Sequence, residues 1–146
     1  MYGFNNICNK QVLPKKEFRH LLKDQFEMYD LLLKCWSRET CSPSFRDKWD
    51  EKTNYTCGQC SITSFLVQDY FGGEVYGIKL PDGVIHSFND VNGDKFDLAS
   101  EQFFGEKLNY DNPILQTRES LIENEDKYNR YLLLKKNFEN LLNTKY

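Results

Sequence analysis

Three side chains in the middle of the sequence have the types and the order that thiol-dependent catalysis requires. Cys60 stands at the start of an apolar segment with helical spacing, and His86 and Asp97 follow at intervals that suit two neighbouring strands. A helix N-terminus favours a thiolate through its dipole and its free N–H groups. An imidazole can then act as the base, and a carboxylate can fix its orientation. The pattern predicts a Cys-His-Asp triad for acyl transfer on a peptide, an amide or a thioester.

The choice of base is narrow because the chain contains only two histidines. His20 falls inside an amphipathic helical pattern, where we expect it to have no role beyond the helix face. His86 falls in a predicted strand. Folding this strand against the next one puts His86 approximately opposite Asp97, and cross-strand neighbours have Cβ atoms only about 5 Å apart. We therefore expect a hydrogen bond between His86 and Asp97.

Three further residues are candidates for binding the substrate or an oxyanion. Gly58 lets the loop before the helix approach a substrate closely. The side-chain amide of Gln59 is a candidate oxyanion donor, beside the backbone N–H of Cys60. Asn89 is a candidate for orienting the site, but it lies three residues after His86. In a continuous strand this odd offset points the two side chains to opposite faces, so Asn89 ranks below Asp97.

Cysteine usage argues against a disulfide scaffold. A redox function for the Cys57-x-x-Cys60 pair expects a βαβ context, which the flanking helical and loop-like segments do not provide. A zinc site needs two further ligands, and Cys35 and Cys41 do not have the spacing of a second knuckle. A reversible disulfide between Cys57 and Cys60 is a further hypothesis, in which oxidation regulates the thiol. We predict no metal and no cofactor. The five cysteines, an odd number without a secretory signal, are Cys8, Cys35, Cys41, Cys57 and Cys60.

Composition limits the class of protein. The chain has 146 residues, of which 40% are hydrophobic and 28% charged, and this fits one domain over residues 1–146. The net charge of −3 and the scattered lysines give no basic surface for nucleic acid. No apolar run approaches the ~20 residues of a membrane span, and the N-terminus lacks the features of a signal peptide. We expect a cytoplasmic protein without nucleic-acid or membrane partners.

Helical periodicity marks the elements before and after the candidate triad. Spacings of three and four between apolar residues predict amphipathic helices. Ser42-Pro43 has the residue types of an N-cap and a first helical position, and Gly72-Gly73 ends the helix that carries Cys60. The predicted helices cover residues 14–36, 42–49, 58–71, 100–104 and 124–142.

Three short segments between these helices have strand character. They cover residues 74–80, 84–88 and 95–98, and the stretch 105–116 has no clear pattern. Pro81-Asp82-Gly83 and the polar residues 89–94 supply the turns between them. Strands grouped together and flanked by helices indicate an α+β fold.

Seven segments together match a pattern known from other proteins: Trp36–Thr40, Asn54–Cys60, Leu66–Glu74, His86–Asn89, Asp97-Leu98, Gln102-Phe103 and Arg130–Lys135. In these segments the chain resembles the YunG-like family of small bacterial proteins. The resemblance implies a papain-like core related to the NlpC/P60 superfamily, with a small antiparallel sheet on the Cys60 helix and flanking N- and C-terminal helices. It also implies a catalytic Cys60, His86 and Asp97, although Cys57 departs from the residue expected in relatives.

The resemblance carries a fold and a site rather than a reaction, so two functions remain open. The first is a cysteine hydrolase or transferase that uses the triad. The second is a non-catalytic module that binds a peptide, an amide or a small ligand in the same cleft. The two differ in the thiol of Cys60: the enzyme needs a pKa well below the free-thiol value of about 8.5, whereas the binding module does not.

Overall fold

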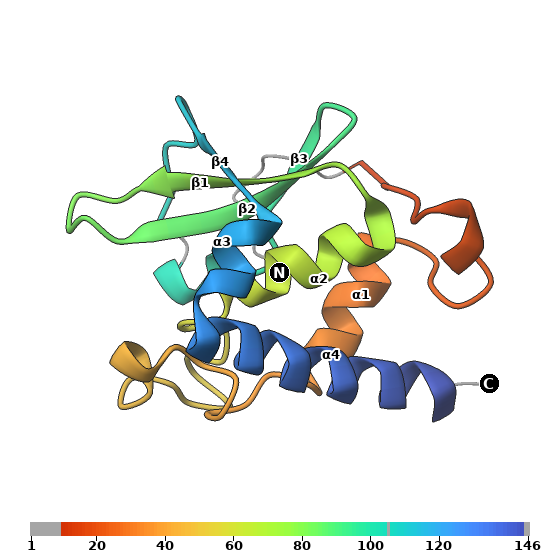
Figure 1. Ribbon diagram of the computed structural model, residues 1–146, viewed down its shortest axis with the longest axis horizontal. Helices are drawn as coiled ribbons and strands as arrows, with labels where there is room; N and C mark the ends of the chain where they lie inside the picture. Colours follow the sequence, from red (N-terminus) through yellow and green to blue (C-terminus); the bar gives the residue numbers. More distant parts are fainter. Residues whose placement is uncertain (1–9, 105, 145–146) are drawn as a thin grey trace.

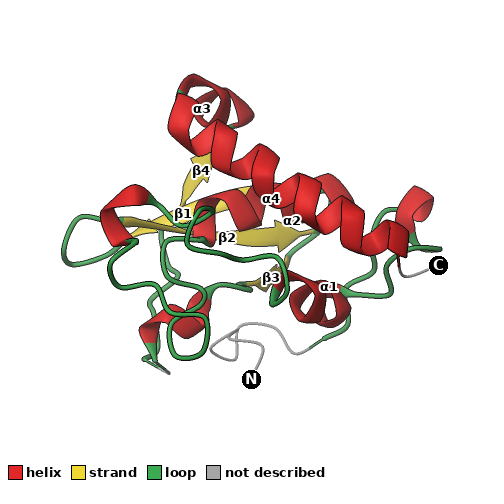
Figure 2. Cartoon of the chain, turned by 90° about the horizontal axis from the view of Figure 1, so that it is seen from below, coloured by secondary structure: helices red, strands yellow, loops and turns green. Residues whose placement is uncertain are grey.

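The computed structural model describes residues 10–104 and 106–144, and the expected α+β class is confirmed. A small antiparallel sheet lies over helix α2 (Cys60–Phe71), and helix α4 (Glu125–Thr144) runs on the opposite side of α2 (Figure 1). Seen from below, α4 crosses the underside of α2, with helix α1 (Gln25–Leu32) beside it (Figure 2). The helix that begins with Cys60 is therefore enclosed by the sheet and α4.

The sheet has four antiparallel strands in the order β3-β2-β1-β4. Strands β1 and β2 form a long hairpin in which Ile78 pairs with His86, and β2 pairs with β3 up to Asn89 and Phe96. The turn between β2 and β3 is Asn92-Gly93, and both residues have positive φ, as a two-residue hairpin turn requires. The strands are β1 (Glu74–Lys79), β2 (Ile85–Val91), β3 (Asp94–Phe96) and β4 (Ile114–Gln116).

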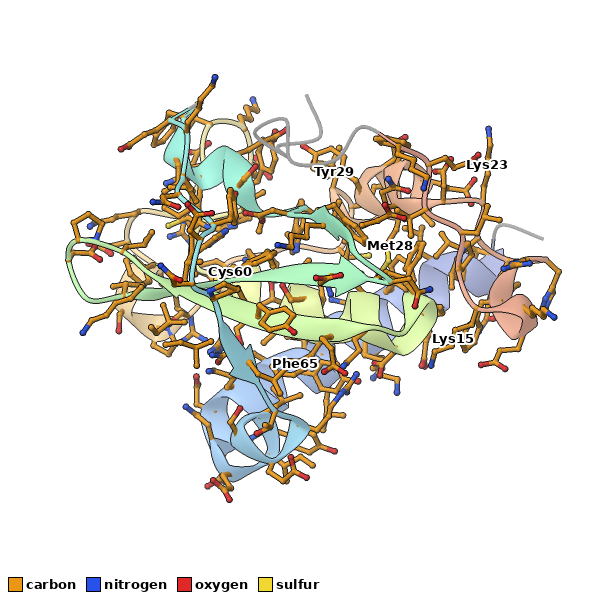
Figure 3. The ribbon with its side chains drawn as sticks, turned by 90° about the horizontal axis from the view of Figure 1, so that it is seen from above. Lys15, Lys23, Met28, Tyr29, Cys60 and Phe65 are labelled. Atoms are coloured by element: carbon orange, nitrogen blue, oxygen red, sulfur yellow. The ribbon has the colours of Figure 1, made fainter. Side chains whose placement is uncertain are left out.

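Helix α2 is the centre of the hydrophobic core. Figure 3 looks down on the sheet and shows α2 passing beneath the strands, with Cys60 and Phe65 on it. Its buried side chains include Ile62 and Leu66, which belong to one apolar cluster with Leu134 of α4. The indole N–H of Trp36 also donates to the hydroxyl of Thr63, at 2.9 Å. Packing on both sides and this buried bond hold the first turn of α2, and Cys60 with it, in one place.

The first predicted helix is shorter than its apolar pattern suggested. Only Gln25–Leu32 is α-helical, because the carboxylate of Asp24 accepts the N–H of Glu27 and caps the helix there. The preceding residues form a 3-10 turn at Lys16–Phe18, and His20 lies in an exposed turn rather than on a helix face.

Two short predicted helices are 3-10 helices. The one expected after Ser42 is a 3-10 turn at Pro43–Phe45, and Ser42 makes no capping hydrogen bond. The one expected over 100–104 is Ser100–Phe103. The helix predicted over 124–142 is confirmed as α4 (Glu125–Thr144). A short helix that was not predicted, α3 (Arg118–Glu123), precedes it, and Asn124 leaves the helical conformation between the two.

The strands also differ in their bounds from the predicted ones. Strand β2 continues to Val91, so Asn89 lies inside a strand and not in a turn. Strand β3 ends at Phe96, and Asp97 is the first residue after it. Strand β4 falls in the stretch for which the sequence has no pattern. Cys8, in the N-terminal segment, and Gly105 lie outside the described residues. Among the helices of the described ranges, none has the length and apolar character to cross a membrane.

Candidate active site

Cys60 is the first residue of α2 and is partly exposed. Gly58, two residues earlier, has a φ of +69°, which a right-handed helix does not allow. The helix therefore begins at Cys60, and the thiol lies in its first turn. The thiol faces β2, where the side chain of His86 and the backbone N–H of Ser87 are close enough to the sulfur to lower its pKa. The local chain thus brings the thiol to the strand that carries the histidine.

The imidazole of His86 is held from its other side by Asp97. Its Nε2 lies 2.6 Å from Oδ2 of Asp97, and both side chains are only 1% exposed. The same Oδ2 accepts the hydroxyl of Tyr110 at 2.7 Å, and Oδ1 accepts the N–H of Ala99 at 3.0 Å. Because Asp97 takes Nε2, Nδ1 is the nitrogen that faces Cys60. The structure therefore brings Cys60, His86 and Asp97 into one row, with a hydrogen bond between His86 and Asp97.

Charges in this row favour the ionised thiol. Burial opposes the charged form of Cys60, but the positive charge of His86 and the hydrogen bonds from His86 and Ser87 outweigh it, and the pKa of Cys60 is lowered. Burial likewise opposes the imidazolium, but the negative charges of Asp97 and Cys60 raise the pKa of His86 to about 10. These interactions therefore favour a thiolate beside an imidazolium over a neutral thiol beside a neutral imidazole.

The three residues proposed to bind the substrate or an oxyanion have different surroundings. Gly58 lines the pocket in front of Cys60. Gln59 is completely buried, and its amide donates to the carbonyl of Ser37 at 2.9 Å and accepts from Thr40 at 2.8 Å. The side chain of Gln59 thus anchors the 37–40 loop, and it is not among the residues that line the pocket.

Asn89 lies on the face of β2 that covers α2. Its amide donates to the carbonyl of Ser64 at 2.9 Å, and the side chain is buried. His86 points to the other face with Phe88, whose ring packs against Tyr110. This is the separation that the odd offset between residues 86 and 89 requires in a continuous strand. Asn89 ties the sheet to α2 and does not contact the imidazole.

The thiol of Cys57 is paired with the thiol of Cys41. The hydrogen bond from Cys41 lowers the pKa of Cys57 to about 7, and the same bond, together with burial, raises the pKa of Cys41. Cys57 also approaches the carbonyl of Phe45, with Sγ 4.0 Å from the oxygen. Within residues 10–104 and 106–144, no three His, Cys, Asp or Glu side chains are grouped to hold a metal ion.

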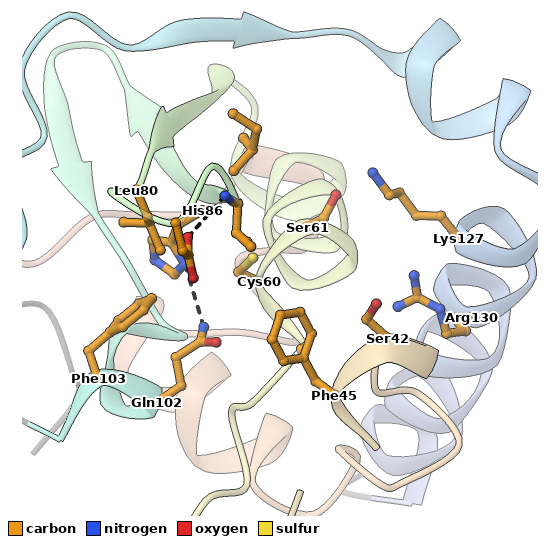
Figure 4. A pocket seen from close by; sticks show the side chains of 14 residues that line it. Ser42, Phe45, Cys60, Ser61, Leu80, His86, Gln102, Phe103, Lys127 and Arg130 are labelled. Atoms are coloured by element: carbon orange, nitrogen blue, oxygen red, sulfur yellow. Dashed lines mark hydrogen bonds between the residues drawn. The ribbon is translucent and has the colours of Figure 1, made fainter. Parts of the chain in front are cut away.

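A pocket of about 210 Å³ opens in front of Cys60. Figure 4 shows Cys60 between His86, Gln102 and Phe103 on one side and Ser42, Lys127 and Arg130 on the other. The edge of the Phe103 ring contacts the imidazole, with ring centroids 4.8 Å apart, and Nε2 of Gln102 lies 3.5 Å from Nδ1 of His86. The pocket thus has Cys60 and His86 at one wall and helix α4 at the other.

Sequence reasoning missed several of these groups. Tyr110 lies in the stretch without a pattern, and its bond to Asp97 is a tertiary contact that spacing does not reveal. Arg130 did carry a signal: it precedes Leu134 and Phe138 at intervals of four residues, on the stripe of α4 that is buried. A charged residue on an apolar helix stripe needs a partner or a function.

Comparison with known proteins gives the family of the chain. The family described as YunG protein matches residues 24–143. The chain is 38% identical over 73 residues to a Bacillus subtilis (strain 168) protein named "Uncharacterized protein YunG". The matched part is 50% of this chain and 57% of that relative, so the chain spans little more than half of the relative's length. No solved structure matches the chain significantly. The chain belongs to the YunG family.

Proposed function

We propose that the protein is a thiol-dependent acyl-transfer enzyme, a compact relative of the papain-like cysteine hydrolases, with Cys60 as nucleophile. The observation that carries the proposal is the row from Cys60 through His86 to Asp97, in which His86 lowers the pKa of the thiol and is itself hydrogen-bonded to Asp97. A helix start, a buried imidazole and a buried carboxylate together supply the low thiol pKa that nucleophilic catalysis needs. The substrate is a peptide, amide or thioester short enough to reach the thiol through the pocket.

In this mechanism the thiolate of Cys60 attacks the carbonyl carbon of the substrate. A C–S bond forms, and the carbonyl π electrons move to the oxygen. The backbone N–H of Cys60 has no partner inside the helix because it lies in the first turn, and it can donate to the developing oxyanion. The imidazolium of His86 then gives its Nδ1 proton to the leaving group as the C–O, C–N or C–S bond breaks. A thioester on Cys60 remains.

The second half of the reaction releases the acyl group. A water or amine attacks the thioester while Nδ1 of His86 takes its proton, and the thiolate of Cys60 leaves. Asp97 keeps Nε2 protonated in both halves, so the same nitrogen gives and receives the proton throughout. Its carboxylate needs no proton of its own.

Acylation of Cys60 can be tested without knowing the natural substrate. The protein is mixed with a panel of p-nitrophenyl esters, p-nitrophenol release is followed, and the acyl adduct is located by peptide mass spectrometry. We expect a burst of one equivalent and a thioester on Cys60, both lost in Cys60→Ala and strongly reduced in His86→Asn.

The matched control is Cys57→Ala. It removes a nearby thiol, three residues before Cys60, that does not line the pocket. This variant should keep the burst. Release that persists in Cys60→Ala would contradict the mechanism. Absence of any acyl adduct, together with an ordinary thiol pKa, would favour the binding module on the same fold.

A further inference from the structure

The pocket in front of Cys60 is chemically divided. On the side of His86 it is mainly apolar, with Leu80, Val84, Ile85 and Phe103. On the other side Ser42 and Ser61 lie beside two cationic residues of α4, Lys127 and Arg130, whose charged ends extend toward the pocket (Figure 4). A substrate held at Cys60 therefore meets hydrophobic surface near the imidazole and positive charge opposite it.

Arg130 is held rigidly and keeps part of its guanidinium unused. Its side chain is only 9% exposed, Nε donates to Asp126 at 2.8 Å and Nη1 donates to the carbonyl of Thr40 at 3.2 Å. Within the described residues, Nη2 makes no such hydrogen bond. A fixed guanidinium with a free nitrogen on a pocket wall is suited to bind an anionic oxygen.

Lys127 adds a second charge on the same wall, one helical turn before Arg130. No carboxylate of residues 10–104 or 106–144 lies within salt-bridge distance of its ammonium. The acidic groups nearby are already engaged or lie elsewhere: Asp126 binds Arg130, and Asp82 at the opposite rim accepts the N–H of Val84. Asp126 thus offsets the charge of Arg130, whereas the charge of Lys127 is left without a paired carboxylate among the described residues.

We propose that the acyl group that reaches Cys60 carries a carboxylate, which Lys127 and Arg130 hold. This inference rests on the proposed function and names the substrate class. The fixed guanidinium of Arg130 and the ammonium of Lys127 can each bind one oxygen of a carboxylate, and the apolar wall accommodates the chain between the carboxylate and the reacting carbon. The natural substrates are then acidic acyl compounds, such as esters, amides or thioesters of short dicarboxylic acids.

The test uses alkylating probes that differ in charge and reach. N-bromoacetyl derivatives of glycine, β-alanine and γ-aminobutyric acid each have a matched neutral amide. In every case the sulfur of Cys60 displaces bromide and forms a thioether, so the chemical step is the same. The ratio of the second-order rate constants for acid and amide, measured by mass spectrometry on Cys60, reports the preference for a carboxylate at each length.

We expect the wild-type protein to prefer the acid at one chain length. In Lys127→Gln this preference should fall roughly two- to fivefold, the usual size for a partly exposed ion pair, and more in Lys127→Glu. Arg130→Lys, which retains the charge but lacks Nη2, should also lower it. Lys136→Gln is the matched control, since Lys136 is an exposed lysine of α4 away from the pocket. Its ratio should equal that of the wild type.

Equal acid-to-amide ratios in wild type and Lys127→Gln at every length would overturn the inference. The ratio can be read even if both rates are those of an ordinary thiol. If the wild type is alkylated as slowly as an ordinary thiol but still prefers the acid, the proposed function alone is overturned. If it is alkylated fast but shows no preference for the acid, the carboxylate site alone is overturned.

Discussion

Replacing Asp97 by asparagine tests how the buried carboxylate controls the thiol. The N–H of Ala99 needs an acceptor at the position of Oδ1. The asparagine must therefore keep its oxygen there and turn its NH2 group toward His86, where Oδ2 now lies 2.6 Å from Nε2. Two donors cannot face each other, so Nε2 loses its proton and Nδ1 keeps one. This is the tautomer that cannot accept a proton from the thiol.

The size of the effect follows from the pKa of His86. The rise from 6.5 to about 10 corresponds to about 5 kcal/mol of net stabilisation of the imidazolium, at about 1.4 kcal/mol for each pKa unit. Loss of the Asp97 charge removes much of this, and the pKa of Cys60 then returns to about 8.5 or above. At pH 6.5 such a thiol is only about 1% ionised, so alkylation should be slower than in the wild type, whose thiol pKa is lowered, by up to about two orders of magnitude.

The assay is the rate of iodoacetamide labelling of Cys60 at pH 6.5, read by mass spectrometry. Tyr110→Phe is the control, because it removes one hydrogen bond to the same Oδ2 but leaves the negative charge. The charge of Asp97 and its bond to His86 both remain in this variant, so it should slow labelling no more than about fivefold. If Asp97→Asn labels within threefold of the wild type at pH 6.5, the assignment of Asp97 is wrong.

Three other predictions concern the loop before α2 and the ion pair. Because the thiols of Cys41 and Cys57 interact with each other, mild hydrogen peroxide should convert them to a disulfide with release of two waters. Peptide mapping identifies the linked cysteines, and a link between Cys57 and Cys60 instead would refute this pairing. Gly58→Ala should lower the free energy of unfolding, measured in urea, by about 2 kcal/mol or more, because φ at residue 58 is positive and a Cβ would lie 2.6 Å from the sulfur of Cys41. Gly83→Ala is the control and should lower it less, because a Cβ there meets nothing within 4 Å. Equal losses in the two variants would contradict the argument. In the folded protein the thiolate–imidazolium pair binds one proton. In the unfolded chain the same two groups bind two protons below pH 6.5, one proton from there to about pH 9, and none above it. The stability that the pair contributes should therefore rise with pH by up to about 1.4 kcal/mol per unit below pH 6.5, stay level to about pH 9 and then fall. Unfolding of the wild type and of a variant without both groups measures this contribution, and a steady slope between pH 6.5 and 9 would refute it.

The position of Cys60 was predictable because local signals determine it. Apolar spacing defines the α2 helix, and the positive φ of Gly58 interrupts the helical conformation just before it. The α+β class followed from the grouping of strands between helices. The dipeptide Asn92-Gly93 is a stronger hairpin-turn signal than the polar stretch 89–94, to which the turn was assigned from the sequence. It would have extended β2 to Val91 and placed Asn89 inside the strand.

The first predicted helix was wrong because apolar spacing was weighed above capping. Asp24 followed by Glu27 is a helix-start signal, and the side chains bond in that way: Asp24 accepts the N–H of Glu27, and Glu27 accepts the N–H of Lys23. The apolar residues before Asp24 belong to turns that pack on the core and not to a helix, as Phe18 does against Tyr70. Periodicity alone does not distinguish these two cases.

The rest of the site depends on tertiary contacts. The bond of Tyr110 to Asp97, the pairing of Cys41 with Cys57 and the approach of Lys127 to the pocket each join segments far apart in the sequence. Nothing in local spacing specifies them. The role of Gln59 was similarly hidden, since its neighbour Cys60 suggested an oxyanion donor whereas its amide is buried against the 37–40 loop.

The pH dependence of Cys60 alkylation in the wild type and in His86→Asn tests the central claim most directly. A thiolate held by an imidazolium should react well at pH values below the ordinary thiol pKa, because His86 lowers the pKa of Cys60 and the pKa of His86 itself, at about 10, keeps the imidazole charged there. In His86→Asn the rate should instead climb with pH, following a thiol pKa of about 8.5 or higher. Identical profiles in the two proteins, both rising with a pKa near 8.5, would show that His86 does not ionise Cys60 and would contradict the account.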